Sequence, residues 1–290
     1  MDYRLKIDRI KLRLHSETYN WTPTSDSVQS AFLTDAPADI VLRVHRGRCE
    51  IDQNQPILKS HSMWWQVYQQ HDGFAFTVAA LESGVHPDRL LLTNRAFTQA
   101  DLFVDDQQAN NGCDPLEYPL NKMLFASFLS LHQGIALHAA GVVVDGRALL
   151  FMGNSGVGKS TMARLWSAER DVTVLADDLI ILRYEEGRFI AYGTPWRGEP
   201  GLTSPASAPL ARIYLIYHSK TNQLAALPAG ARLAARLFNQ SYPPYWLQEG
   251  LAAHIDLIER LALTIPCFEL GFLPDPSVIS CVRATCGNDL

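Results

Sequence analysis

The sequence lacks any stretch near the roughly 18 consecutive apolar residues that a membrane-spanning helix needs. Its opening residues, MDYRLKIDRIKLRLH, interleave charge with leucine and isoleucine and do not resemble a secretory signal peptide. Its five cysteines are scattered, without a Cys-x-x-Cys pair, and do not suggest a disulfide framework. We therefore expect a cytoplasmic protein whose cysteines serve as small core residues.

Positive charge is also scarce. The 290 residues include 25 Lys and Arg against 30 Asp and Glu, a formal net charge of −5. Such a chain lacks the positive field that gives proteins non-specific affinity for nucleic acid. We expect neither nucleic acid nor a membrane among its partners. With 47% hydrophobic residues and no low-complexity tract or internal repeat, the chain is expected to fold.

The first hundred residues look rich in β-strands. Apolar and basic residues alternate near the start of the chain, and one extra residue interrupts the alternation. This pattern predicts a single strand with a β-bulge. The apolar positions of this strand are Leu5, Ile7, Ile10, Leu12 and Leu14. Residues 107–114 (QQANNGCD) are polar and rich in turn formers, so they are the predicted linker. We expect a β-rich domain over 1–106 and a second domain over 115–290.

The second domain shows both helical and strand patterns. Pro119 opens a helical pattern. Two apolar runs, Ile135–Val144 and Arg147–Met152, are separated by Asp145-Gly146, a strong signal for a two-residue hairpin turn. Glu186-Gly187 gives a second hairpin signal. Further segments predict helices over 160–168, 229–238, 247–263 and 276–283, and strands over 172–176, 213–217 and 266–272. Hairpins that alternate with helices predict an α/β fold with a mixed sheet.

The strongest functional signal is Gly153-Asn154-Ser155-Gly156-Val157-Gly158-Lys159-Ser160, followed by Thr161. The segment matches G-x-x-x-x-G-K-[ST] and lies between a predicted strand and a predicted helix. Its glycines allow backbone N–H groups to point at phosphate oxygens, and the helix start adds a positive dipole end. We expect it to bind ATP, with Lys159 at the phosphates and Ser160 on Mg²⁺. The alternative, a structural turn with an incidental lysine, is disfavoured by this context.

Asp177 and Asp178 directly follow a predicted strand, Val172–Ala176. One carboxylate suits Mg²⁺ binding and its neighbour suits accepting a proton from an attacking hydroxyl. Taken alone, the pair fits a helix cap or a solvated turn equally well. A nearby phosphate-binding loop favours the catalytic interpretation.

Three other features have open interpretations. His138 lies in the strand before Asp145-Gly146 and suits either the core or catalysis. The loop over 193–199 contains Arg197, which suits phosphate, and Glu199, which suits a metal, but it also fits a packed tryptophan on a surface loop. The cluster Tyr242-Pro243-Pro244-Tyr245-Trp246 suits a peptide groove, although a rigid loop is the favoured interpretation.

The text from Leu137 to Asp178, LHAAGVVVDGRALLFMGNSGVGKST…VLADD, resembles the HPr kinase/phosphorylase family and its phosphoenolpyruvate-carboxykinase-like relatives. The resemblance implies a mixed-sheet P-loop kinase domain, here preceded by a β-rich N-terminal region. It implies that residues 153–161 bind ATP, that Ser160, Asp177 and Glu199 bind Mg²⁺, and that Lys159, Asp178 and His138 are catalytic. Asp178 matches the base that takes the proton of the acceptor hydroxyl.

The resemblance has departures and consequences for function. Thr161 stands where bacterial HPr kinases usually have Glu, and the distal catalytic arginine is unassigned among Arg212, Arg232 and Arg236. We expect a kinase that transfers the γ-phosphoryl group of ATP to a serine-type hydroxyl of a protein or peptide. Some similar proteins act on ribosomal-peptide precursors, and relatives are often homo-oligomers. The alternatives are a small-molecule kinase and a non-catalytic ATP-sensing regulator.

Overall fold

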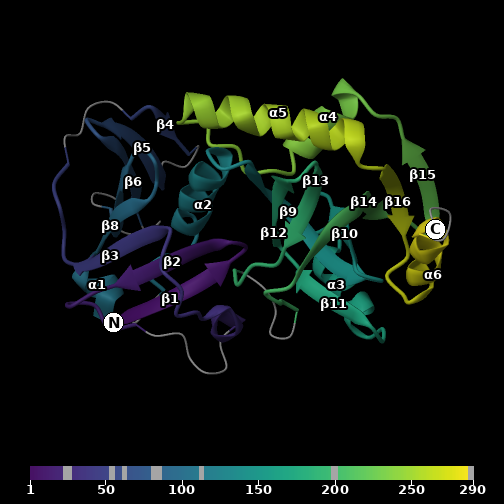
Figure 1. Ribbon diagram of the computed structural model, residues 1–290, viewed down its shortest axis with the longest axis horizontal. Helices are drawn as coiled ribbons and strands as arrows, with labels where there is room; N and C mark the ends of the chain where they lie inside the picture. Colours follow the sequence, from purple (N-terminus) through teal and green to yellow (C-terminus); the bar gives the residue numbers. More distant parts are fainter. Residues whose placement is uncertain are drawn as a thin grey trace. The chain divides into compact units, whose positions relative to one another are not determined.

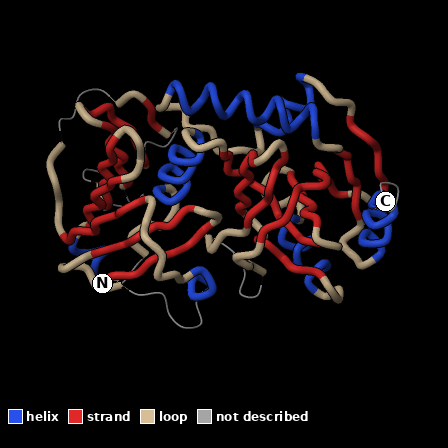
Figure 2. The backbone as a smooth tube through the Cα atoms, viewed as in Figure 1, coloured by secondary structure: helices blue, strands red, loops and turns tan. Residues whose placement is uncertain are grey.

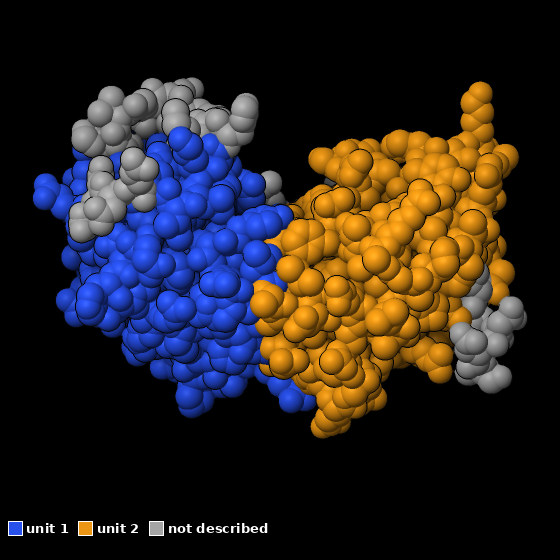
Figure 3. All heavy atoms as spheres, turned by 90° about the horizontal axis from the view of Figure 1, so that it is seen from above, with its two compact units in different colours: residues 1–132, 244–251 blue, residues 133–243, 252–290 orange. Residues whose placement is uncertain are grey.

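The computed structural model describes residues 1–21, 28–51, 56–60, 64–79, 87–110, 114–196 and 202–286. The chain divides into two units (Figure 3), each with its own core. Unit 1 comprises Met1–His132 and Pro244–Leu251, and unit 2 comprises Gln133–Pro243 and Ala252–Leu290. Within the described residues, none of the helices combines the length and the apolar character that crossing a bilayer requires.

Unit 1 is built on an eight-stranded mixed sheet with the order β1-β2-β3-β8-β7-β6-β5-β4 (Figure 1). β2 pairs parallel with β3, and β3 pairs parallel with β8, whereas the other neighbours are antiparallel. The elements are β1 (Asp2–Ile7), β2 (Ile10–His15), η1 (Val28–Phe32), β3 (Ile40–Arg46), β4 (Leu58–Lys59), β5 (Trp65–Gln70), β6 (Gly73–Val78), β7 (Arg89–Asn94), β8 (Gln99–Val104), α1 (Asp106–Asn110) and α2 (Leu120–Ser130).

The predicted single strand with a bulge at the N-terminus is wrong. The structure has two antiparallel strands, β1 and β2, in which Ile7 pairs with Ile10. Asp8 and Arg9 form the turn, and Asp8 adopts a φ of +65°, which Asp tolerates better than most residues. The extra residue in the pattern is thus part of a turn, and the five apolar positions all remain buried at 0–3% exposure.

The boundary between the units also differs from the expected linker at 107–114. All 11 residues of α2 are buried, and a helix buried on every side needs packing partners all round. The Trp246 indole Nε1 donates to Ser127 Oγ on this helix at 2.9 Å, and its ring meets Phe76 edge-on at 5.3 Å. α2 therefore belongs to unit 1, together with the distant segment Pro244–Leu251.

Unit 2 contains the second mixed sheet, ordered β10-β9-β12-β13-β14-β16-β15, with β11 paired to β9 and β10 also paired to β14. β14 runs parallel to β10 and β16, and the remaining pairs are antiparallel, so the predicted mixed sheet is confirmed. The elements are β9 (Gly134–Val144), β10 (Arg147–Met152), α3 (Lys159–Ser167), β11 (Val172–Ala176), β12 (Leu179–Glu185), β13 (Arg188–Tyr192), β14 (Ser207–His218), β15 (Gln223–Leu227), α4 (Ala231–Phe238), α5 (Gln248–Thr264), β16 (Cys267–Phe272) and α6 (Ser277–Cys286). The first four residues of α5 belong to unit 1 and the rest to unit 2.

Both predicted hairpins of unit 2 are confirmed. Asp145 and Gly146 have φ values of +50° and +72°, and Glu186 and Gly187 have φ values of +49° and +83°. Two successive residues with positive φ give a turn whose twist matches that of the flanking strands. The turns fix the register of β9 with β10 and of β12 with β13.

Helices cover both faces of the second sheet (Figures 1 and 2). Alternate residues of β9 point to opposite faces, as a strand requires. Leu137 and Ala139 join a core with residues of α4 and α5, whereas Ala140 and Val142 join a core with residues of α3 and α6. The sheet is thus the middle layer of three, and functional groups at its strand ends have a rigid support.

One buried histidine in unit 2 makes stability depend on pH. His254 on α5 is 1% exposed. The Ser241 hydroxyl donates to Phe238 O at 2.7 Å and therefore accepts a hydrogen bond from His254 Nε2, at 2.8 Å. Burial lowers the pKa of His254 from the usual 6.5 to about 4, because desolvation disfavours the charged imidazolium.

We predict that the free energy of unfolding falls as the pH decreases from about 6.5 to about 4, because the unfolded chain takes up the proton first. The slope attributable to His254 is at most about 1.4 kcal/mol per pH unit. His254→Gln should flatten urea-unfolding stability between these two pH values. His71→Gln, at a histidine whose side chain is 95% exposed, is the control. Equal pH dependence in wild type and His254→Gln would contradict the prediction.

Candidate functional site

A cavity of about 290 Å³ lies at one end of the second sheet. Its lining residues come from β9, from the loop after β10, from the start of α3 and from the two residues between β11 and β12. They are His138, Ser155, Gly156, Gly158, Lys159, Ser160, Thr161, Asp177 and Asp178. The structure thus gathers most of the predicted site residues around one space.

Strand pairing explains this gathering. Gly141 of β9 pairs with Leu150 of β10 on one edge and with Ala176 of β11 on the other, so β10 and β11 run in the same direction. β10 ends at Met152 opposite Ala139, and Ala139 N donates to Asp178 O at 3.1 Å on the opposite edge. The glycine-rich loop and the acidic pair therefore lie next to the two opposite edges of β9 at the level of Ala139.

The glycine-rich loop has a backbone that only glycine adopts without strain. Gly156 and Gly158 have φ values of +79° and +103°. A Cβ atom at Gly158 would lie 2.7 Å from Phe272 Cζ. Gly158 immediately precedes α3, so the first turn of this helix, at the positive end of its dipole, begins at the cavity.

Lys159 is 7% exposed, and its ammonium group lies within the loop. Nζ donates to Gly153 O at 2.8 Å and to Asn154 O at 3.1 Å. Gly153, Asn154 and Val157 shape the loop, although they are not among the residues that line the cavity. The positive charge of Lys159 therefore lies on the same side of the cavity as the positive end of the α3 dipole.

Asp177 and Asp178 face the cavity from the other edge of β9. Asp177 is 3% exposed, and the Asp178 side chain is 22% exposed. His138 Nδ1 lies 3.1 Å from Asp178 Oδ1 and 3.2 Å from Asp178 O. His138 of β9 pairs with Leu179 of β12, and this pairing keeps the His138 side chain next to that of the preceding residue, Asp178. The pair can exchange a proton with a group bound in the cavity.

The loop after β13 lies against the end of β11. Thr194 is fully buried, and its hydroxyl donates to Leu179 O at 2.8 Å. A Cβ atom at Gly193 would lie 2.4 Å from Leu175 O, so the backbones approach closely here. Gly193 and Thr194 therefore pack against the backbone on either side of the acidic pair, at Leu175 and Leu179. Two residues considered in the sequence, Arg197 and Glu199, lie outside the described residues.

Two residues that sequence analysis did not assign to the site are Gln240 and Tyr242. Gln240 Nε2 donates to Asn154 Oδ1 at 3.1 Å, and Gln240 O accepts from His138 N at 2.7 Å. The Tyr242 hydroxyl lies 3.3 Å from His138 Nδ1. The sequence signal here was the aromatic and proline cluster over 242–246, which has no spacing that points to His138.

The donor atoms present fit Mg²⁺ held together with a phosphate ligand. In the described part of the chain, no group of three or more His, Cys, Asp or Glu side chains is arranged to hold a metal. Ser160 and Asp177 nevertheless line one cavity with a hydroxyl and a carboxylate. Mg²⁺ commonly uses one or two carboxylates and completes its shell with substrate phosphates and water.

The candidate arginines do not contribute to this cavity among the described residues. Arg212 is buried at 5% exposure, Arg232 is exposed, and Arg236 pairs with Glu269 at 2.7 Å. The residues that line the cavity include none of the three.

No protein-family model matches the chain, and no curated protein is significantly similar to it. Among solved structures, the chain is similar to the structure of the HPr(Ser) kinase/phosphatase from Coxiella burnetii. The similarity has a TM-score of 0.32 and 13% sequence identity, and covers 52% of this chain and 97% of that chain. It is a distant structural similarity that assigns neither a family nor an activity to this chain.

Proposed function

We propose that this chain is an ATP- and Mg²⁺-dependent kinase that transfers the γ-phosphoryl group to a serine-type hydroxyl of a protein or peptide, with unit 2 as its P-loop domain. The single observation that carries the proposal is the two-sided cavity. Lys159 and Ser160 line one side, and the pair of Asp178 and His138 lines the other. Phosphoryl transfer needs this combination of cationic and amide donors with a carboxylate base.

The phosphate side of the cavity would bind the triphosphate. The loop residues from Gly153 to Gly158 and the first turn of α3 offer backbone N–H groups and a positive dipole end. Lys159 has a compact charge next to these groups and would turn from the loop carbonyls towards the β- and γ-phosphates. Thr161 lines the same wall.

Ser160 and Asp177 would hold Mg²⁺ beside the triphosphate. When bound, the ion would neutralise charge that develops on the transferring phosphoryl group. Asp177 is well placed for this role, since burial at 3% exposure keeps its carboxylate in a fixed position.

The acceptor side would activate the serine hydroxyl. The hydroxyl oxygen attacks the γ-phosphorus while the bond to the β–γ bridging oxygen breaks, and ADP leaves. Asp178 takes the hydroxyl proton, and His138, within 3.1 Å, orients its carboxylate. Tyr242 in turn positions the imidazole of His138. The N-terminal unit would contribute to recognition of the acceptor.

We predict that Lys159→Ala lowers phosphoryl transfer at least about 100-fold, because a pre-organised charge at the developing transition state is lost. The measurement is transfer of labelled γ-phosphate from ATP to candidate serine peptides. Lys220→Ala, at an exposed lysine of unit 2, is the matched control and should keep wild-type activity. Full turnover by Lys159→Ala would refute the kinase assignment.

Asp178→Asn should separate a kinase from a non-catalytic sensor. The amide keeps the size of the side chain but cannot accept the proton, so transfer should fall at least about 100-fold. Affinity for a fluorescent ATP analogue should remain within about threefold, because Asp178 is not expected to bind the nucleotide. Asp256→Asn, at an exposed carboxylate of α5, serves as the control. Nucleotide binding by wild-type protein without transfer to any acceptor would favour the sensor.

Tyr242→Phe tests the positioning of His138. The change removes one hydroxyl, and a neutral hydrogen bond is worth about 1 kcal/mol, so kcat should fall roughly fivefold. KM for ATP should not change, because the phenol contacts His138, which is assigned to the acceptor side, and not the glycine-rich loop. Tyr217→Phe, at a tyrosine that is 40% exposed, should leave both constants unaltered. A change in KM for ATP with unchanged kcat would contradict a positioning role.

A further inference from the structure

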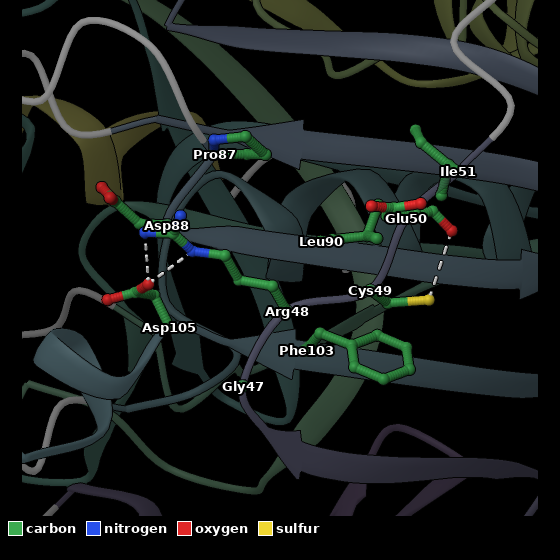
Figure 4. A pocket seen from close by; sticks show the side chains of 10 residues that line it. All are labelled: Gly47, Arg48, Cys49, Glu50, Ile51, Pro87, Asp88, Leu90, Phe103 and Asp105. Carbon is green, nitrogen blue, oxygen red and sulfur yellow. Dashed lines mark hydrogen bonds and ion pairs between the residues drawn. The ribbon is translucent and has the colours of Figure 1, made fainter.

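Unit 1 contains a larger cavity, of about 510 Å³, that the proposed chemistry does not use (Figure 4). Three chain segments form it: the stretch that follows β3, the start of β7 and the end of β8. The lining residues are Gly47, Arg48, Cys49, Glu50, Ile51, Pro87, Asp88, Leu90, Phe103 and Asp105. All ten of these described residues belong to unit 1.

The floor of the cavity is apolar and rigid. Leu90 of β7 pairs directly with Phe103 of β8, and Leu90 is 4% exposed. The Phe103 ring stacks on His45 of β3 with centroids 4.7 Å apart. Leu90 belongs to a small core cluster against which Cys49, Ile51 and Phe103 pack. A pre-formed apolar surface of this kind favours an apolar side chain of a ligand.

The rim of the cavity is acidic. Three carboxylates, Glu50, Asp88 and Asp105, line the cavity with one guanidinium, that of Arg48. Arg48 Nε and Nη2 each lie 2.8 Å from Asp105 Oδ2. Gln107 N also donates to Asp105 Oδ1 at 2.9 Å, and this hydrogen bond, together with those from Arg48, lowers the pKa of Asp105. Among the described residues that line the cavity, carboxylates therefore outnumber cationic groups by three to one.

The charges are arranged at both ends of the apolar floor. Figure 4 shows Asp88 and Asp105 together at one end and Glu50 with Ile51 at the other, with Leu90 and Phe103 between them. A ligand that lies along the floor therefore meets a carboxylate at each end. Opposite charge on the ligand would guide its approach and fix its register.

We infer that this cavity binds an extended peptide segment in which a lysine or arginine is followed by an apolar residue. The cationic side chain lies against the acidic rim, and the apolar side chain lies on Leu90 and Phe103. The identification of that peptide as part of the acceptor rests on the proposed kinase function, whereas its binding does not. A volume of about 510 Å³ accommodates two such side chains but not a folded element.

The test is binding of labelled peptides to the full chain. A fluorescein-labelled, acetylated and amidated peptide with one Lys-Leu pair in a Gly-Ser background should raise fluorescence anisotropy on titration with protein. Counterparts with Glu-Leu or Lys-Ser should bind at least about fivefold more weakly, because each lacks one of the two contacts. Saturating peptide should slow alkylation of Cys49 by iodoacetamide, whereas Cys281 of unit 2 is the internal reference.

Charge reversal locates the site. Glu50→Lys should weaken binding of the Lys-Leu peptide about tenfold. Asp72→Lys, which makes the same charge change at an exposed turn outside the cavity, should change it less than twofold. Peptide binding by both variants should be measured without ATP, so that no phosphoryl transfer takes place during the titration. Lys159→Ala should be measured in the same way and should bind the peptide as wild type does.

Several outcomes would overturn the inference. They are equal binding of the Glu-Leu and Lys-Leu peptides, equal effects of Glu50→Lys and Asp72→Lys, or unchanged alkylation of Cys49 at saturation. Equal binding of the Lys-Ser peptide, together with its displacement by spermidine, would assign the cavity to a bare cation instead. Binding of the Lys-Leu peptide, together with no phosphoryl transfer to any of the candidate serine acceptors, would retain this site and remove the proposed kinase function alone.

Discussion

Antiparallel pairing on both edges of β9 is the constraint on which the candidate site depends. β10 pairs with one edge, and β11 and β12 pair with consecutive stretches of the other. The glycine-rich loop leaves the sheet where β10 ends, opposite Ala139, and the Asp177-Asp178 pair interrupts the opposite edge at the same level. Because both strands are buried between helix layers, the two sides of the cavity cannot separate without breaking the sheet.

Local signals made much of this arrangement predictable. Asp145-Gly146 and Glu186-Gly187 specify their turns through backbone preferences of single residues, and the register of two hairpins follows from them. The strand over 172–176 and the helix after the glycine-rich loop follow from composition over a few residues. The correct predictions are therefore those of elements whose structure is determined by residues close together in the sequence.

Long-range packing decided the rest. Asp8-Arg9 is not a distinctive turn sequence, so the β1–β2 hairpin was taken for one strand, and the pairing of Ile7 with Ile10 is what distinguishes the two. α2 belongs to unit 1 because Trp246, more than 100 positions later, donates to Ser127 on it. Gln240 and Tyr242 contact Asn154 and His138 because an isolated bridge joins Leu137 to Ser241. No local pattern encodes such contacts.

The segment over 240–242 links both sides of the cavity. Its main chain extends the edge of β9, since Tyr242 N donates to Ala136 O and His138 N donates to Gln240 O. Its side chains contact Asn154 in the glycine-rich loop and His138 beside Asp178. A shift of this segment would therefore move the phosphate side and the acceptor side together. The same stretch of chain passes into unit 1 at Pro244, which is one of three points at which the chain passes from one unit to the other.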